Sequence, residues 1–124
     1  MKKILIIDDD PASRQAIRSA LAEWYQVVDA SGGQDGIAQL DSQVFDLVIC
    51  DVIMPDIDGL EIVRHIRSRD ANLPIVIISG GGRINSSDYL RIGVAFGAQK
   101  SLAKPIRVRE LRHTVAALID AEAA

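Results

Sequence analysis

Short apolar runs alternate along this chain with longer stretches in which apolar residues recur at helical spacing. The runs predict five strands, over residues 4–7, 26–30, 45–50, 74–78 and 99–103. A helix is predicted after each strand, the third from Asp58 or Gly59, the fourth over 87–96 and the last over about 108–120. Alternation of this kind predicts a parallel sheet with helices on both faces. Because crossovers are right-handed, the expected fold class is α/β, a doubly wound five-stranded sheet.

Two details of this pattern predict how the elements pack. The first helix carries one apolar stripe, formed by Ala16, Ile17, Ala20, Leu21 and Trp24. The fifth run is less apolar than the others, which indicates a strand at an edge of the sheet.

The composition fits one intracellular domain, spanning residues 1–124. Hydrophobic residues make up 48% of the chain, enough for a core without disulfides or a structural metal. Cys50, the only cysteine, lies inside an apolar run, which suits a reducing compartment. No signal peptide is visible, and no stretch approaches the roughly 20 apolar residues of a membrane span. We therefore expect a cytoplasmic protein without membrane contact, and a net charge of −3 gives no reason to expect nucleic-acid binding.

Polar residues follow four of the predicted strands directly. Asp8-Asp9-Asp10 follows the first strand, Asp51 the third, Ser79 the fourth and Lys104-Pro105 the fifth. In doubly wound sheets ligands bind beyond the carboxyl ends of the strands, so these side chains are expected to meet. Several carboxylates in one place repel each other unless a cation such as Mg²⁺ (or Mn²⁺) neutralises them. A lysine, a hydroxyl and an aspartate nucleophile complete a set suited to phosphoryl transfer.

With these motifs in this order, the sequence resembles the receiver domains of bacterial two-component response regulators along its whole length. The matching stretches are Ile4 to Asp10, Asp51 to Gly59, Ile77 to Ser79, and Lys104-Pro105. The resemblance implies a flavodoxin-like (βα)5 fold with strand order 2-1-3-4-5. It also implies a cis bond between Lys104 and Pro105.

The resemblance assigns a role to each motif residue. Asp51 corresponds to the phosphoacceptor, and Asp9 to a direct Mg²⁺ ligand. Asp8 would act on the metal directly or through water, and the backbone carbonyl of Ile53 would be a further ligand. Ser79 matches the hydroxyl that turns to the phosphoryl group, and Lys104 the lysine that pairs first with the acceptor and then with a phosphoryl oxygen.

Two departures from the family pattern carry expectations of their own. Ser101 replaces the aromatic residue that many receivers use to report activation, so we expect readout through the loop beginning at Gly80 or through the fourth helix. The positions that tune hydrolysis in the family are Ile53 and Gly81, neither of which can orient a water. We therefore expect slow self-dephosphorylation.

The expected function is a signalling switch or a phosphorelay intermediate, not an enzyme acting on other substrates. A sensor histidine kinase or a histidine phosphotransfer protein would supply the phosphoryl group. The chain ends just after the fifth helix, so we expect no output domain and a signal passed by contact with a downstream protein target.

Alternatives remain open for the acids and for the function. Asp10 is expected to cap the first helix, because Pro11 follows it and proline is favoured at the first helical position. Asp8-Asp9-Asp10 contains the Asp-x-Asp of a phosphatase with an aspartyl nucleophile, although Ala12 stands where that family has threonine or a similar residue. A receiver-like scaffold that is never phosphorylated is the second rival.

Overall fold

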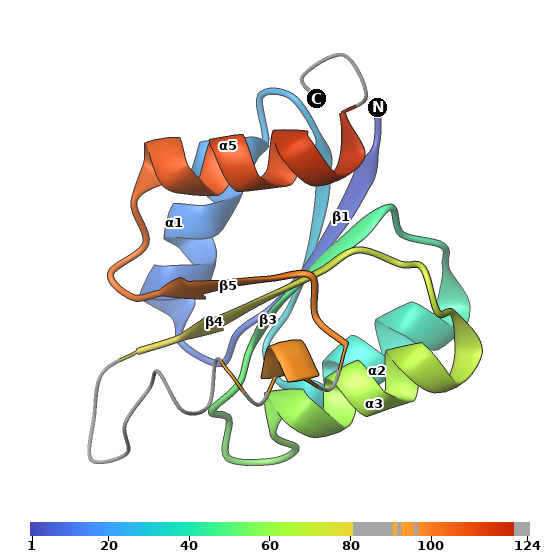
Figure 1. Ribbon diagram of the computed structural model, residues 1–124. Coiled ribbons are helices and arrows are strands. Elements are labelled where there is room, and N and C mark those ends of the chain that lie inside the picture. The colour runs from blue at the N-terminus through green and yellow to red at the C-terminus, as the bar shows by residue number, and fades with distance from the viewer. Residues whose placement is uncertain (81–90, 92, 96, 121–124) are drawn as a thin grey trace.

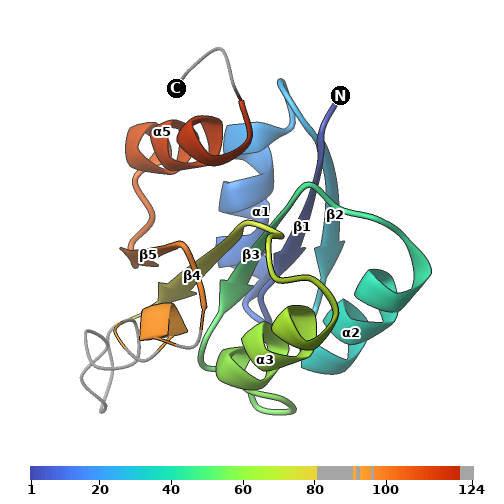
Figure 2. The same ribbon diagram turned by 45° about the vertical axis from the view of Figure 1, so that its right-hand side comes forward.

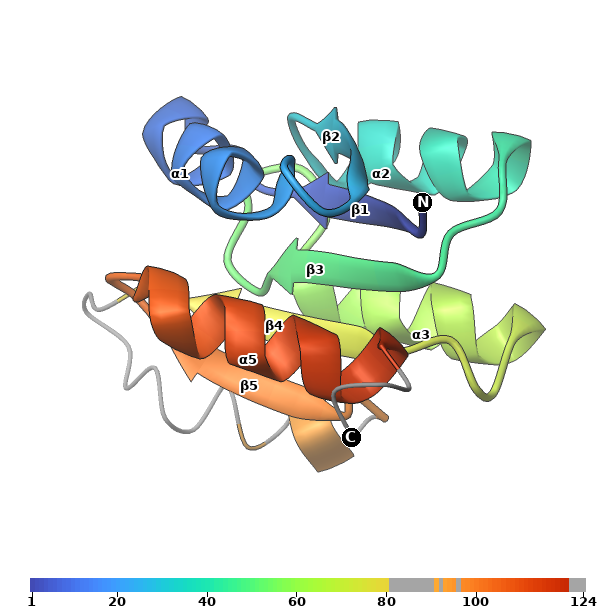
Figure 3. The ribbon, with the colours of Figure 1, turned by 90° about the horizontal axis from the view of Figure 1, so that it is seen from above.

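Five parallel strands form the centre of the protein, in the order β2-β1-β3-β4-β5 (Figure 1). The computed structural model describes residues 1–80, 91, 93–95 and 97–120. The strands are β1 (Lys3–Ile7), β2 (Gln26–Ala30), β3 (Leu47–Asp51), β4 (Ile75–Ser79) and β5 (Lys100–Ala103). The predicted fold class and strand order are confirmed. The arrows of β3, β4 and β5 point the same way in Figure 3, so their carboxyl ends share one edge.

Helices cover both faces of the sheet. They are α1 (Pro11–Leu21), α2 (Gly33–Ser42), α3 (Gly59–Arg69) and α5 (Val108–Ile119). Figure 2 shows α1 and α5 on one side and α2 and α3 on the other. Each pair of helices packs on its own apolar core.

Side chains of each central strand alternate between these two cores. Ile4 and Ile6 pack with the core under α1 and α5, whereas Leu5 and Ile7 pack with the core under α2 and α3. All four are fully buried. A strand buried on both faces has no polar face to alternate with, which explains the continuous apolar runs of the sequence.

The apolar stripe predicted for α1 is only partly correct. Ile17, Ala20 and Leu21 are buried as expected, but Ala16 is exposed and Trp24 is 49% exposed. The helix ends at Leu21, so Trp24 leaves the helical face and its ring lies 4.5 Å from the guanidinium carbon of Arg112. A cation over the ring makes partial exposure of an indole tolerable.

Two further predictions concern the edge strand of the sheet and the fourth helix. β5 lies at an edge of the sheet, as its weaker apolar character predicted. The predicted helix over 87–96 lies largely outside the described residues, although Arg91 and 93–95 are helical. Among the described residues, no helix combines the length and apolar character that crossing a membrane requires.

Candidate functional site

Three carboxylates converge at the carboxyl ends of β1 and β3. Asp8 follows β1 directly and Asp51 is the last residue of β3, and the pairing of Ile7 with Cys50 brings these ends side by side. One carboxylate oxygen from each of Asp8, Asp9 and Asp51 lies within 4.8 Å of the others. Asp8 is fully buried, Asp51 is 4% exposed and Asp9 is exposed. The acids that the sequence singled out therefore form one cluster that opens to solvent at Asp9.

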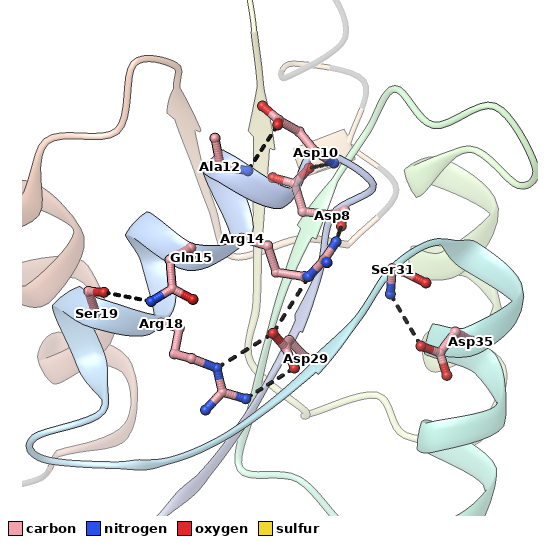
Figure 4. Close-up of polar contacts among 10 residues, drawn as sticks. All are labelled: Asp8, Asp10, Ala12, Arg14, Gln15, Arg18, Ser19, Asp29, Ser31 and Asp35. Atoms are coloured by element: carbon pink, nitrogen blue, oxygen red, sulfur yellow. Dashed lines mark hydrogen bonds and ion pairs between the residues drawn. The ribbon is translucent and has the colours of Figure 1, made fainter.

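Asp8 has one carboxylate oxygen satisfied and one without a hydrogen bond. Its Oδ1 accepts from the Asp10 amide at 2.9 Å (Figure 4). Its Oδ2 is buried and has no hydrogen-bond donor among the described residues, although Lys104 Nζ lies 3.2 Å away as an ion-pair partner. A buried carboxylate oxygen without a hydrogen bond is costly, and a further positive charge beside it would lower that cost.

Asp51 is held by one contact on each carboxylate oxygen. Oδ1 accepts from the Ile53 amide at 3.0 Å and Oδ2 from Lys104 Nζ at 2.9 Å. Burial raises the pKa of the Asp51 carboxyl above its ordinary value; those two hydrogen bonds offset part of this, and the charge of Asp8 adds to it. Burial lowers the pKa of Lys104, but its pairing with Asp51 and Asp8 raises it by more, so the ammonium stays charged.

Ser79 ends β4 and Lys104 follows β5, and the side chain of Lys104 reaches the acidic cluster. Ser79 pairs with Ala103 in the sheet register, and the Lys104 amide donates to the Ser79 carbonyl at 2.8 Å. The Ser79 side chain is fully buried, and its hydroxyl donates to the Gly80 carbonyl at 3.3 Å. The Lys104-Pro105 bond is cis, as the resemblance implied.

The cluster fits a small divalent cation. Three carboxylate oxygens close together form the hard, anionic donor set that Mg²⁺ or Mn²⁺ takes, and Asp8 Oδ2 is a buried acceptor in need of charge. Ile53 lies beside them, 44% exposed, with its amide on Asp51. The metal role of its carbonyl stays a prediction.

Gly59 allows α3 to begin directly against the end of β3, which the sequence did not reveal. A Cβ at this position would lie 2.3 Å from the Asp51 carbonyl oxygen and 2.5 Å from the Cα of Val52. The Gly59 amide donates to the Val52 carbonyl at 2.9 Å. The Asp58 side chain caps the helix by accepting from the amides of Leu60 and Glu61. Only a residue without a side chain fits this approach.

Asp56 is a second residue that the sequence analysis missed. Its carboxylate accepts from the amides of Gly33 and Gln34, both at 3.0 Å, at the start of α2. These hydrogen bonds, that of Gln34 first, lower the pKa of Asp56. Gly32, which precedes α2, offers no side-chain cap of its own, but this signal alone does not identify Asp56 as the residue that supplies the cap.

The expectations about Asp10 and about the departures from the family pattern have different outcomes. Asp10 caps α1 as expected, accepting from Ala12 at 3.1 Å, with Pro11 as the first helical residue. Ser101 is half-buried in β5, paired with Ile77 in the register. Gly81, the loop that follows Gly80 and most of the fourth helix lie outside the described residues, so readout through them stays a prediction.

Comparison with known proteins identifies the family. The model of the response regulator receiver domain matches residues 4–116. Transcriptional regulatory protein AfsQ1 of Streptomyces coelicolor is 35% identical over 96% of this chain and 52% of its own length. Response regulator MprA of Mycolicibacterium vanbaalenii is 36% identical over 94% of this chain and 50% of its own.

A solved structure agrees with this result. The CheY-like receiver domain protein of Methanospirillum hungatei superposes with a TM-score of 0.86 at 26% identity, covering 97% of this chain and 94% of its own. The chain spans about half the length of the curated relatives that it matches. The fold, the cluster and these similarities together show that the chain belongs to the response regulator receiver domain family.

Proposed function

We propose that this receiver domain accepts a phosphoryl group on Asp51 and acts as a signalling switch or a phosphorelay intermediate. The observation that carries the proposal is the placement of Asp51. Its carboxylate lies between a charged lysine, 2.9 Å away, and two further carboxylates within 4.8 Å. Phosphoryl transfer depends mainly on such positioning and on neutralisation of charge.

The proposed transfer step uses this geometry. A carboxylate oxygen of Asp51 forms a bond to phosphorus while the bond between phosphorus and the donor nitrogen breaks, which leaves an acyl phosphate on the protein. The Lys104 ammonium, already beside Asp51 Oδ2, moves to pair with a phosphoryl oxygen. The Ser79 hydroxyl, whose present bond to Gly80 is long at 3.3 Å, turns to donate to another.

A divalent cation, Mg²⁺ or Mn²⁺, would be held by Asp8, Asp9, Asp51 and the Ile53 carbonyl. When bound it supplies positive charge that neutralises the carboxylates and the oxygens of the phosphoryl group. The buried Oδ2 of Asp8 supports this part of the proposal, because its partner among the described residues is the ion-paired Lys104 and it accepts no hydrogen bond from them. Without the cation, three clustered carboxylates would disfavour the approach of an anionic donor.

The proposed donor is a sensor histidine kinase or a histidine phosphotransfer protein, and the proposed output is contact with a downstream protein. Phosphorylation would favour one of two conformations of the domain. The domain would catalyse only its own phosphorylation and dephosphorylation. Independence from nucleic acid stays a prediction, since AfsQ1 is by name a transcriptional regulatory protein, and this chain matches 52% of its length.

Labelling with radioactive acetyl phosphate in Mg²⁺ tests the proposal. Wild type should be labelled, and Asp51→Asn should lower the labelling by about 100-fold or more, because the nucleophile is lost. Asp46→Asn is the matched control, since Asp46 precedes the same strand at its far end and its bond to the Lys3 amide survives in asparagine. If Asp51→Asn kept its label on Asp8, the phosphatase alternative would stand. If wild type took no label, the scaffold alternative would stand.

A further inference from the structure

Arg14, on α1, reaches across to the turn that carries the acidic cluster. Its Nη1 donates to the main-chain carbonyl of Asp8 at 2.8 Å, and its Nε lies 3.5 Å from Asp29 Oδ2 on β2 (Figure 4). The Arg14 side chain is 21% exposed, so it lies largely within the protein. One guanidinium therefore joins three elements: α1, β2 and the end of β1.

Asp29 anchors this guanidinium from a strand position that would otherwise be apolar. It lies in β2 opposite Ile6, on the face that packs against α1. Arg18 also binds it, with Nη2 3.0 Å from Oδ1. A hydrogen bond from Arg18, with the charges of Arg18 and Arg14, lowers the pKa of Asp29. Asp29 thus stays charged and forms an ion pair with Arg14. This ion pair competes with any pairing of Arg14 with the clustered carboxylates.

The Asp8 carbonyl that Arg14 binds lies in the main chain between two of the clustered carboxylates. The Asp8 amide donates to the Ala30 carbonyl at 3.2 Å, so Arg14 on the carbonyl fixes the other side of the residue. The same carbonyl belongs to the peptide that leads to Asp9, whose side chain is exposed. Arg14 therefore restrains the main chain from which the carboxylates of Asp8 and Asp9 extend.

We propose that Arg14 is a positioning residue for the divalent-cation site. It holds the Asp8-Asp9 turn so that three carboxylates converge, while Asp29 neutralises its charge and keeps it off the acids. The inference rests on the proposed function, because it concerns the same site. Partners that orient metal ligands in this way typically contribute about 10- to 100-fold in metal affinity.

Mn²⁺ affinity, measured from the loss of the free-ion signal in electron paramagnetic resonance, tests the inference without any phosphorylation. Arg14→Gln should weaken Mn²⁺ binding by about tenfold. The Mn²⁺ affinity of Arg14→Lys should lie between those of wild type and Arg14→Gln, because one ammonium cannot replace two guanidinium contacts. Asp29→Asn should also weaken binding, since the freed Arg14 can then pair with the acids in place of the ion.

Arg18→Gln is the matched control. It removes an arginine of the same helix that pairs with Asp29 but makes no contact with Asp8 among the described residues, so Mn²⁺ affinity should change by less than about twofold. Urea unfolding of each variant separates loss of fold from loss of affinity, and Arg14→Lys replaces Arg14→Gln if the latter does not fold. An Arg14 variant that folds and binds Mn²⁺ like wild type would overturn the inference. Failure of wild type to bind Mn²⁺ would instead overturn the proposed function.

Discussion

The two halves of the site are held by different means. The acid half, Asp8, Asp9 and Asp51, is tied down by contacts from outside the cluster, including the amides of Asp10 and Ile53 and the guanidinium of Arg14. In the lysine half, Ser79 and Lys104, the strand register places the backbone. Among the residues that the structure describes, its side-chain contacts are the long bond of Ser79 to Gly80 and the pairing of Lys104 with the acids.

This difference matches the demands of the proposed reaction. Groups that hold a cation and present a nucleophile gain from fixed positions before the donor arrives, because reorganisation during the reaction is then avoided. Ser79 and Lys104 must instead change partners when a phosphoryl group appears. A side chain with one long hydrogen bond, or with an ion pair that the product replaces, can do so at small cost.

Two glycines allow the comparison to be tested at the level of stability. Gly59→Ala should destabilise the protein by about 2–4 kcal/mol in urea unfolding, because the new Cβ would meet backbone atoms of Asp51 and Val52 that cannot move aside. In Gly80→Ala the nearest contact with a described residue is Lys104 Cδ at 3.4 Å, which is ordinary packing, so the change should stay within about 1 kcal/mol.

Labelling by acetyl phosphate extends the same pair of variants. Gly59→Ala should lose most of its labelling even where it remains folded, because the Asp51 backbone is displaced. Gly80→Ala should keep it. Equal losses of stability in the two variants would mean that the halves do not differ in rigidity.

Much of the fold followed from the sequence because each central strand is buried on both faces. Four apolar residues in a row after Lys3 left little choice about β1, and the carboxyl ends of parallel strands necessarily gather the polar residues that follow them. The helix boundary before Trp24 was less predictable. Apolar spacing continues past Leu21, whereas a cation supplied by the distant α5 satisfies the indole outside the helix.

The residues that hold the acid half in place could not be predicted from the sequence. Arg14, Asp29 and Asp56 are charged residues of kinds that occur on any solvated surface. Their roles arise from partners elsewhere in the chain. Asp56, for example, accepts a hydrogen bond from the Gln34 amide at the start of α2, 22 residues away in the sequence. Spacing along one element cannot reveal such contacts, whereas ligands at strand ends can be found from topology alone.

Ile53 provides a kinetic test of the acid half. It is 44% exposed beside Asp51 and has no polar atom in its side chain that could hold an attacking water. The phosphorylated protein should therefore persist well beyond seconds, and Ile53→Asn should shorten its lifetime by roughly tenfold. Decay of the radioactive label after removal of the donor measures both.

Val44→Asn is the control for this experiment, since Val44 is 86% exposed but precedes β3, at the end of the strand opposite Asp51. Its lifetime should equal that of wild type. A wild-type lifetime of seconds, or an unchanged decay in Ile53→Asn, would show that another group directs water to Asp51.

The smallest expected effect concerns Asp56, which joins α2 to the loop after Asp51. Its pKa is lowered in the folded state, so the stability that it contributes is present above its unfolded pKa of about 3.9 and is lost as the pH falls through the folded value. The gap in unfolding free energy between wild type and Asp56→Asn should therefore be constant from neutral pH to about pH 5, and narrow below about pH 4.

Urea unfolding at several pH values measures this gap. Asparagine keeps one acceptor oxygen for the amides of Gly33 and Gln34 but loses the charge that favours a helix start. A gap that did not change down to pH 3 would mean that the hydrogen bonds, and not the charge, carry the contact. A difference in unfolding free energy that narrows at low pH would mean that the charge of Asp56 contributes. The loop after β3 would then hold the Asp51 carboxylate through Ile53 and the start of α2 through Asp56.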